Sequence, residues 1–129
     1  IVEAQMTEWR WDNFTPEEMS CQHCRRMGMH PDFLDDLQAL RTAFGAAIPV
    51  TSGYRCPEHN AKISKTGPTG PHTTGRAVDI GLGGASALVL VKLALEHGFT
   101  GLGVNQKGVG RFIHLDKIID GPRPNIWSY

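Results

Sequence analysis

The stretch PHTTGRAVDI, residues 71–80, places polar side chains with metal-binding chemistry inside an otherwise apolar pattern. Its second half, residues 76–80, is typical of a strand, so we expect Asp79 to lie in a sheet between two apolar neighbours. A carboxylate at such a position is costly unless it is paired or coordinates a metal. Gly75 permits a sharp turn that would bring His72 back beside Asp79. The stretch therefore predicts that His72 and Asp79 lie side by side.

A second stretch, FIHLD at residues 112–116, has the same character. Residues two apart in a strand share a face, so His114 and Asp116 would point together, away from their apolar neighbours. With His72 and Asp79, His114 makes a set of two imidazoles and one carboxylate that leaves a fourth position open for water. This is the form of a catalytic zinc site rather than a closed structural one. The alternative is that these residues are ordinary hydrogen-bonded His–Asp pairs.

The rest of the chain alternates helices and short strands. Apolar residues at helical spacing, with Pro or Gly near the ends, predict helices over residues 16–19, 31–44, 57–63 and 85–97. Strands are predicted over residues 48–52, 76–80, 101–104 and 111–115, with a loop over 64–71 and a turn over 105–108. This mixture favours an α+β fold with a small, mainly antiparallel sheet flanked by helices. We expect a single domain over residues 1–129, with an aromatic-rich N-terminal arm over about residues 1–30.

The composition argues against some classes of protein, namely nucleic-acid-binding and membrane-spanning proteins. The chain has 129 residues, of which 40% are hydrophobic and 20% charged, as in globular proteins. Thirteen Lys and Arg balance thirteen Asp and Glu, which argues against a nucleic-acid partner, because such proteins usually carry a basic excess. The longest apolar run, residues 85–95, is far short of the roughly 20 residues that a membrane span needs. Residues 1–10 lack the features of a signal peptide, and we expect a monomer.

The three cysteines are too few for a disulfide-built scaffold. Cys21 and Cys24 form a C-x-x-C pair, and Cys56 stands alone. A structural zinc needs four ligands, and the chain has no second C-x-x-C. A small metal knuckle that adds His23 and Cys56, and a disulfide from Cys56 to one of the pair, are the alternatives to free thiols. Because only two thiols sit together in the sequence, we expect no essential second metal site here.

These motifs together resemble the zinc D-Ala-D-Ala carboxypeptidase family, and most closely its small single-domain branch of murein endopeptidases and phage endolysins. That family carries SGYR, then H-x-x-G-x-A-x-D, then H-x-D near the C-terminus. This chain has SGYR at residues 52–55, the second motif at 72–79 and the third at 114–116. The resemblance runs from about Phe14 to Trp127. It implies the compact α+β fold that the family shares with the Hedgehog signalling domain.

The resemblance implies a zinc-dependent peptidase that hydrolyses an amide bond in the peptide part of peptidoglycan, as a carboxypeptidase or an endopeptidase. Such an enzyme acts on the cell wall, in the periplasm or outside the cell, or after release by phage lysis. His72, Asp79 and His114 would be the Zn²⁺ ligands. Arg55 would bind the substrate carboxylate or the carbonyl oxygen at the scissile bond, a task that suits its planar fork. Trp127 would wall the cleft against a glycan or the stem peptide, although a tail packed on the core fits the sequence equally well.

The general base is where the sequence departs from part of the family. Many members carry Glu or Asp three residues before the last ligand, whereas this chain has Arg111, which cannot accept a proton. Asp116 is the best candidate for the base, because it shares a strand face with His114. A role in orienting His114 is about as well supported. Gly70, where many relatives have Ser, is a further departure. The missing acid also leaves open an alternative function, a non-catalytic metal-bound binding domain on the Hedgehog-like scaffold.

Overall fold

The computed structural model describes residues 9–129. Residues 1–8 of the expected N-terminal arm, and most of the segment tested for a signal peptide, lie outside the described residues. The strands are β1 (Val50–Ser52), β2 (Ala77–Ile80), β3 (Gly101–Asn105), β4 (Phe112–Asp116) and β5 (Asn125–Ser128). The helices are α2 (Pro16–Met19), α3 (Pro31–Phe44), α4 (Pro57–Ile63) and α5 (Gly84–Glu96), with 3₁₀ turns η1 (Gly67–Thr69) and η2 (Pro71–Thr74). The four predicted helices and four predicted strands are confirmed, to within two residues at their ends.

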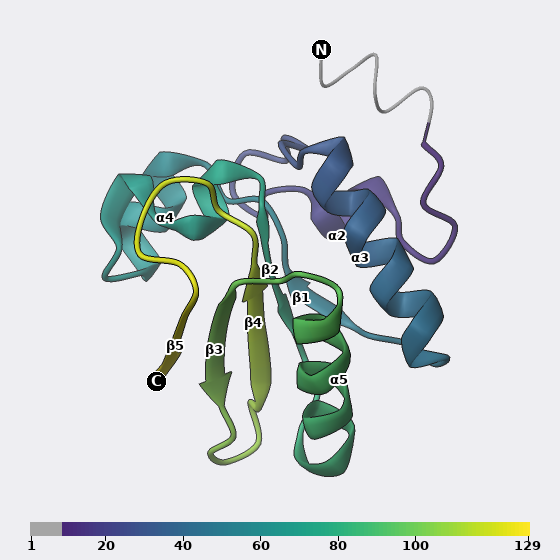
Figure 1. The fold of residues 1–129 in the computed structure, drawn as a ribbon. Coiled ribbons are helices and arrows are strands. Elements are labelled where there is room, and N and C mark those ends of the chain that lie inside the picture. The colour runs from purple at the N-terminus through teal and green to yellow at the C-terminus, as the bar shows by residue number, and fades with distance from the viewer. Residues whose placement is uncertain (1–8) are drawn as a thin grey trace.

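The strands form one sheet in the order β1-β2-β4-β3-β5 (Figure 1). The pairings β1–β2, β2–β4 and β4–β3 are antiparallel, whereas β3 and β5 are parallel. The sheet is therefore mixed, and the expectation of a mainly antiparallel sheet is wrong. The reason is β5, which the sequence pattern does not predict because Pro122 and Pro124 mark the tail as a loop. After these prolines the backbone of Asn125 and Tyr129 donates hydrogen bonds to carbonyls of the β3 segment, at Thr100 and Val104.

The apolar core lies between the sheet and the two long helices. The helix residues in the core include Phe33, Leu34, Leu37 and Leu40 of α3, and Ala87, Leu90 and Ala94 of α5. The strand residues in the same cluster include Val78 and Ile80 of β2, and Ile113 and Leu115 of β4. Because side chains alternate along a strand, the residues between them point to the opposite face of the sheet. The central strands β2 and β4 thus present apolar side chains to the core, and they present the polar side chains of Asp79, His114 and Asp116 to the other side, beside Ala77 and Phe112.

The described part of the expected arm packs on the core. Trp11, Phe14 and Met19 are buried, and the backbone N–H of Tyr54 donates to the carbonyl of Met19. This contact ties α2 to the segment that follows β1, which carries Arg55. Within residues 9–129, no helix combines the length and the apolar character that crossing a membrane requires.

Candidate metal centre

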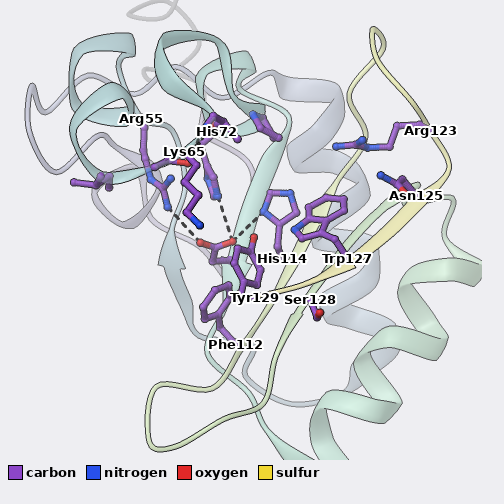
Figure 2. A pocket seen from close by; sticks show the side chains of 15 residues that line it. Arg55, Lys65, His72, Phe112, His114, Arg123, Asn125, Trp127, Ser128 and Tyr129 are labelled. Atoms are coloured by element: carbon purple, nitrogen blue, oxygen red, sulfur yellow. Dashed lines mark hydrogen bonds and ion pairs between the residues drawn. The ribbon is translucent and has the colours of Figure 1, made fainter.

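The central strands bring two of the three predicted ligands face to face. Asp79 on β2 is directly opposite His114 on β4 in the antiparallel register. His72 lies in η2, and Gly75, with φ of 77°, turns the chain from η2 towards β2. A side chain at Gly75 would be strained by this φ and would collide with the backbone carbonyl of Gly28. The ligand atoms of His72, Asp79 and His114 all lie within 4.8 Å of one another (Figure 2).

Hydrogen bonds fix which ring nitrogen of each histidine faces the carboxylate. His72 Nδ1 lies 2.8 Å from the carbonyl oxygen of Gly53, and this oxygen can only accept, so Nδ1 carries the proton. His114 Nε2 lies 2.7 Å from Asp116 Oδ2, and by the same reasoning Nε2 donates to the carboxylate. The remaining ring nitrogens, His72 Nε2 and His114 Nδ1, lie 3.2 Å and 3.1 Å from Asp79 Oδ1. Three acceptor atoms therefore converge with no proton of a neutral ring between them.

Three acceptor atoms that point at one another repel, and a positive charge between them removes this repulsion. Burial alone would lower the pKa of His114, but the carboxylates of Asp116 and Asp79 outweigh burial and raise it. Burial alone would raise the pKa of Asp79, but His114 and His72 outweigh burial and hold it far below its ordinary range. The first shift means that the two carboxylates attract positive charge to the ring, and the second means that Asp79 stays an anion. Two imidazoles and one carboxylate are a ligand set that Zn²⁺ takes in catalytic sites, so the residues present fit that ion.

Asp116 lies behind His114 rather than in the open cleft. Its side chain is fully buried, and Arg123 donates to both of its oxygens, from Nε at 2.9 Å and from Nη2 at 2.8 Å. Burial would raise the pKa of Asp116, but the hydrogen bonds from Arg123 and His114 outweigh it and lower the pKa to about 2. This placement favours the orienting role over the role of general base. Gly101 of β3 makes room for the carboxylate, since a Cβ there would collide with Asp116.

Arg55 is held rigidly at the edge of the cluster. Its Nε donates to Ser52 Oγ at 3.1 Å, its Nη1 donates to Asn60 Oδ1 at 3.0 Å, and its Nη2 lies 3.4 Å from Asp79 Oδ2. The backbone N–H of Arg55 also donates to the carbonyl of His72. Nη2 carries two N–H groups, so beside its contact with Asp79 it can also meet a negatively charged or carbonyl oxygen in the cleft.

If the site has the peptidase activity that the sequence resemblance implies, replacing Arg55 with Ala should lower that activity by about 100-fold or more, the scale for removing one donor to a transition state. Zinc content and the fold should be retained, because Arg55 donates to Asp79 but supplies no ligand atom. Turnover and metal content are measured together, with Arg76→Ala as the matched control, since Arg76 pairs with Asp32 and does not line the cleft. An inactive Arg55→Ala protein that has also lost its zinc would show that Arg55 acts structurally.

The cluster opens into a cleft of about 780 Å³. Aromatic side chains line one side of it, namely Phe112, Trp127 and Tyr129 (Figure 2). The Trp127 ring centroid is 5.1 Å from that of His114, and Gly103 makes room for the indole, since a Cβ there would collide with it. Trp127 thus lies in a strand of the sheet and also lines the cleft. The two alternatives for the tail, packing on the fold and lining the cleft, are both met.

Lys65 and Arg123 also line the cleft, although the sequence pattern does not single them out. Lys65 lies in the Gly- and Pro-rich loop, where η1 and η2 fold the chain over α4. The one signal for Arg123 is a charged residue between two prolines, Pro122 and Pro124, in a tail that reads as a loop.

The two departures from the family pattern have structural explanations. The guanidinium of Arg111 lies against Gly83 at the start of α5, and Arg111 does not line the cleft. Gly70 is buried against Thr66 and Asn60, and a Cβ there would collide with Thr66. A serine at position 70 would therefore require this loop to move.

A buried His-Asp-His cluster at the floor of a cleft is the architecture of a mononuclear metalloenzyme. A family model described as Peptidase M15 matches residues 12–116, which include SGYR, all three candidate ligands and Asp116. The chain therefore belongs to the Peptidase M15 family, the zinc D-Ala-D-Ala carboxypeptidase family. The comparisons with curated proteins and with solved structures gave no match.

Proposed function

We propose that this protein is a zinc-dependent peptidase that hydrolyses an amide bond in the peptide part of peptidoglycan. The observation that carries the proposal is the convergence of His72 Nε2, His114 Nδ1 and Asp79 Oδ1 at the floor of an open cleft. Membership of a family of zinc peptidases supports the same reaction class. We further propose that residues 1–129 act as one monomeric domain, since the ligand set, Arg55 and the cleft wall come from the same chain.

Each residue of the cluster has a distinct task in this proposal. His72, Asp79 and His114 would hold the zinc ion, which when bound polarises a carbonyl group and makes water a nucleophile near neutral pH. The Gly53 carbonyl holds His72 in the tautomer that leaves Nε2 free, and Asp116 does the same for His114 Nδ1. Arg55 would hold negative charge on the substrate through Nη2. These hydrogen bonds preorganise the cluster, so little reorientation is needed when substrate binds.

The lining of the cleft suits an anionic peptide. Arg55 and Lys65 offer positive charge, and Asp79 is the one carboxylate among the described residues that line the cleft. Peptidoglycan stem peptides carry free carboxylates and small side chains, and a cleft with cations on one side and aromatic rings on the other can bind both features. Trp127 and Tyr129 supply the aromatic surface.

The second candidate is a non-catalytic metal-bound binding domain on a Hedgehog-like scaffold. The observation that favours it is the scarcity of proton acceptors in the cleft. Asp116 is buried behind His114, and Arg111 lies away from the cleft. Under this reading the same cations and aromatic rings would bind the wall peptide without cutting it.

Removing the metal should abolish hydrolysis and restoring zinc should recover it. Purified peptidoglycan is incubated with the chelated protein, with the zinc-restored protein and with zinc alone, and the products are identified by mass spectrometry. Release of terminal D-Ala indicates a carboxypeptidase, whereas cleavage of cross-linked dimers indicates an endopeptidase, as in wall degradation or phage lysis. A zinc-restored protein that sediments with the walls but releases no product would contradict the peptidase proposal and support the binding domain.

A further inference from the structure

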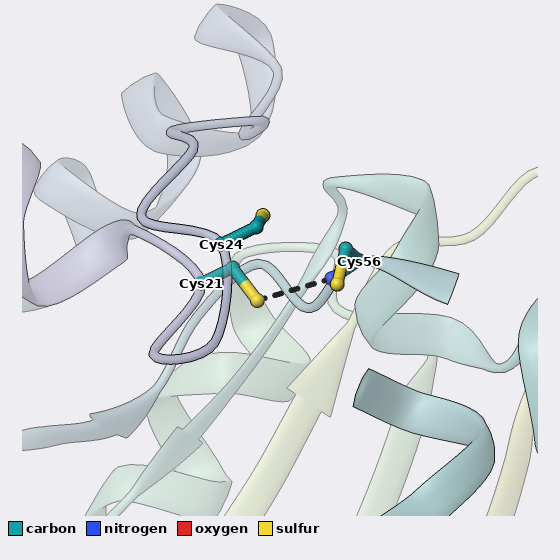
Figure 3. Close-up of side chains that lie close together, drawn as sticks. All are labelled: Cys21, Cys24 and Cys56. Atoms are coloured by element: carbon teal, nitrogen blue, oxygen red, sulfur yellow. Dashed lines mark hydrogen bonds between the residues drawn. The ribbon is translucent and has the colours of Figure 1, made fainter. Parts of the chain in front are cut away.

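A second cluster of metal-binding side chains lies apart from the cleft, where the C-x-x-C segment meets the start of α4. The Sγ atoms of Cys21, Cys24 and Cys56 lie within 4.8 Å of one another (Figure 3). All three are free thiols. The expectation of no second metal site rested on only two thiols lying together, and the fold overturns that premise by bringing Cys56 to the pair.

A fourth candidate donor, His23, contacts one of the three sulfurs but lies outside the group of donor atoms that are within 4.8 Å of one another. His23 Nδ1 is 3.4 Å from Cys56 Sγ. The His23 ring also stacks on His59, with centroids 5.5 Å apart, which supports its orientation. Closed structural zinc sites include the Cys₃His set, and His23, turned towards the other two sulfurs, would complete that set.

The backbone around Cys21 is arranged to stabilise a thiolate. The N–H of Cys56 donates to Cys21 Sγ at 3.3 Å. The thiolate is the form that binds metals.

The turn that carries the pair has an unusual backbone. Cys21 donates its N–H to the carbonyl of Arg26 at 2.9 Å and accepts the N–H of Arg25 at 2.8 Å. Arg25 has φ of 64°, the one left-handed residue other than glycine in the part of the chain that the structure describes. Such a conformation disfavours a residue with a Cβ. The turn keeps it and thereby directs Cys21 and Cys24 towards Cys56.

We propose that Cys21, Cys24, Cys56 and His23 bind a second zinc ion, as a structural site distinct from the His72-Asp79-His114 cluster. A tetrahedral site with Zn–S bonds of about 2.3 Å has edges of about 3.8 Å, so the sulfurs need only a small contraction to enclose the ion. The site joins the N-terminal segment to the residue that directly follows Arg55. It would thereby hold the SGYR segment, whose Gly53 and Arg55 both contact His72.

Cobalt(II) tests this proposal with a signal that the cleft cannot produce. Reduced metal-free protein is titrated with Co²⁺, and thiolate-to-cobalt charge-transfer absorption is recorded in the near ultraviolet, together with the metal equivalents bound. We expect two equivalents and a strong charge-transfer band in the parent. The His72→Ala variant should bind one equivalent and keep the band, because its cleft ligand set is broken while the sulfur site is intact. The Cys24→Ser variant should bind one equivalent and lose the band.

The role of His23 is tested by matched variants of the two stacked imidazoles. His23→Gln should shift the ligand-field spectrum of the bound cobalt and weaken binding, whereas His59→Gln should leave both unchanged. Because Cys24→Ser can impair folding, zinc protection of the parent protein supplies a second measurement. Zinc should protect all three thiols from alkylation. Absence of the charge-transfer band in the reduced parent, or alkylation of all three thiols at the same rate with and without zinc, would overturn the proposal. Two of the three thiols unreactive in denaturant without reductant would also overturn it, in favour of a disulfide.

Discussion

Replacing His72 with Ala should lower the zinc content by one equivalent and reduce wall hydrolysis to the level of the metal-free protein. The loss should be large because His72 supplies one of three ligand atoms and its hydrogen bond to Gly53 fixes the tautomer that presents Nε2. The variant would retain only Asp79 and His114, and a catalytic zinc site normally has three protein ligands. Metal content of the purified protein and turnover on peptidoglycan measure the two effects, and His114→Ala should behave in the same way.

The matched control is His97→Ala. His97 lies at the C-terminal end of α5, where its ring contacts the carbonyl of Leu93, and it does not line the cleft. This variant should keep the parent's zinc content and activity. Full zinc content in both the His72 and the His114 variants would show that the ligand assignment is wrong.

Replacing Asp116 with Asn should weaken zinc binding by about 10- to 100-fold, the usual effect of losing the partner of a metal-binding histidine. The reason is geometric, since Asp116 accepts the Nε2 proton of His114 at 2.7 Å and so directs Nδ1 towards Asp79. Excess zinc should restore most of the activity. Zinc affinity and turnover at saturating zinc are measured on the same preparation.

The same experiment tests Asp116 as the general base. If Asp116 takes the proton, turnover at full zinc occupancy should stay reduced by roughly 100- to 10,000-fold, the range for loss of acid–base help. Unchanged affinity together with unchanged turnover would exclude both roles. Asp120→Asn is the control, because Asp120 is an exposed carboxylate in the segment that follows β4. It should match the parent in both measurements.

The candidate metal centre could be predicted because its signals are local. Alternation along β2 and β4 indicates that Asp79, His114 and Asp116 leave the apolar face, and Gly75 indicates the turn that returns His72 to the strand. The resemblance to the zinc D-Ala-D-Ala carboxypeptidase family then supplied the assignment of the three ligands and the role expected of Arg55. The register that sets Asp79 opposite His114 is consistent with these patterns, but it depends on strand pairing, which no single stretch encodes.

What escaped prediction depends on contacts between distant segments. The prolines at 122 and 124 predict a loop, so β5 was not predicted. This strand forms because its backbone pairs with the edge of β3, and not because its own residues have a strong strand propensity. Arg123 was missed for the same reason, since its partner Asp116 belongs to another strand. Cys56 looks solitary in the sequence, and it lies beside Cys21 and Cys24 because α2 packs against β1 and the segment that follows it.

The carboxylate of Asp116 contacts both a candidate metal ligand and the segment that leads into β5. One oxygen accepts from His114 and both accept from Arg123, which lies in the connection between β4 and β5. The position of the β5 tail and the proposed affinity of the cluster for a metal ion would therefore be coupled through a single side chain. Such coupling is reciprocal. Occupancy at His114 should strengthen docking of the tail that bears Trp127, and docking of that tail should strengthen occupancy by the same factor.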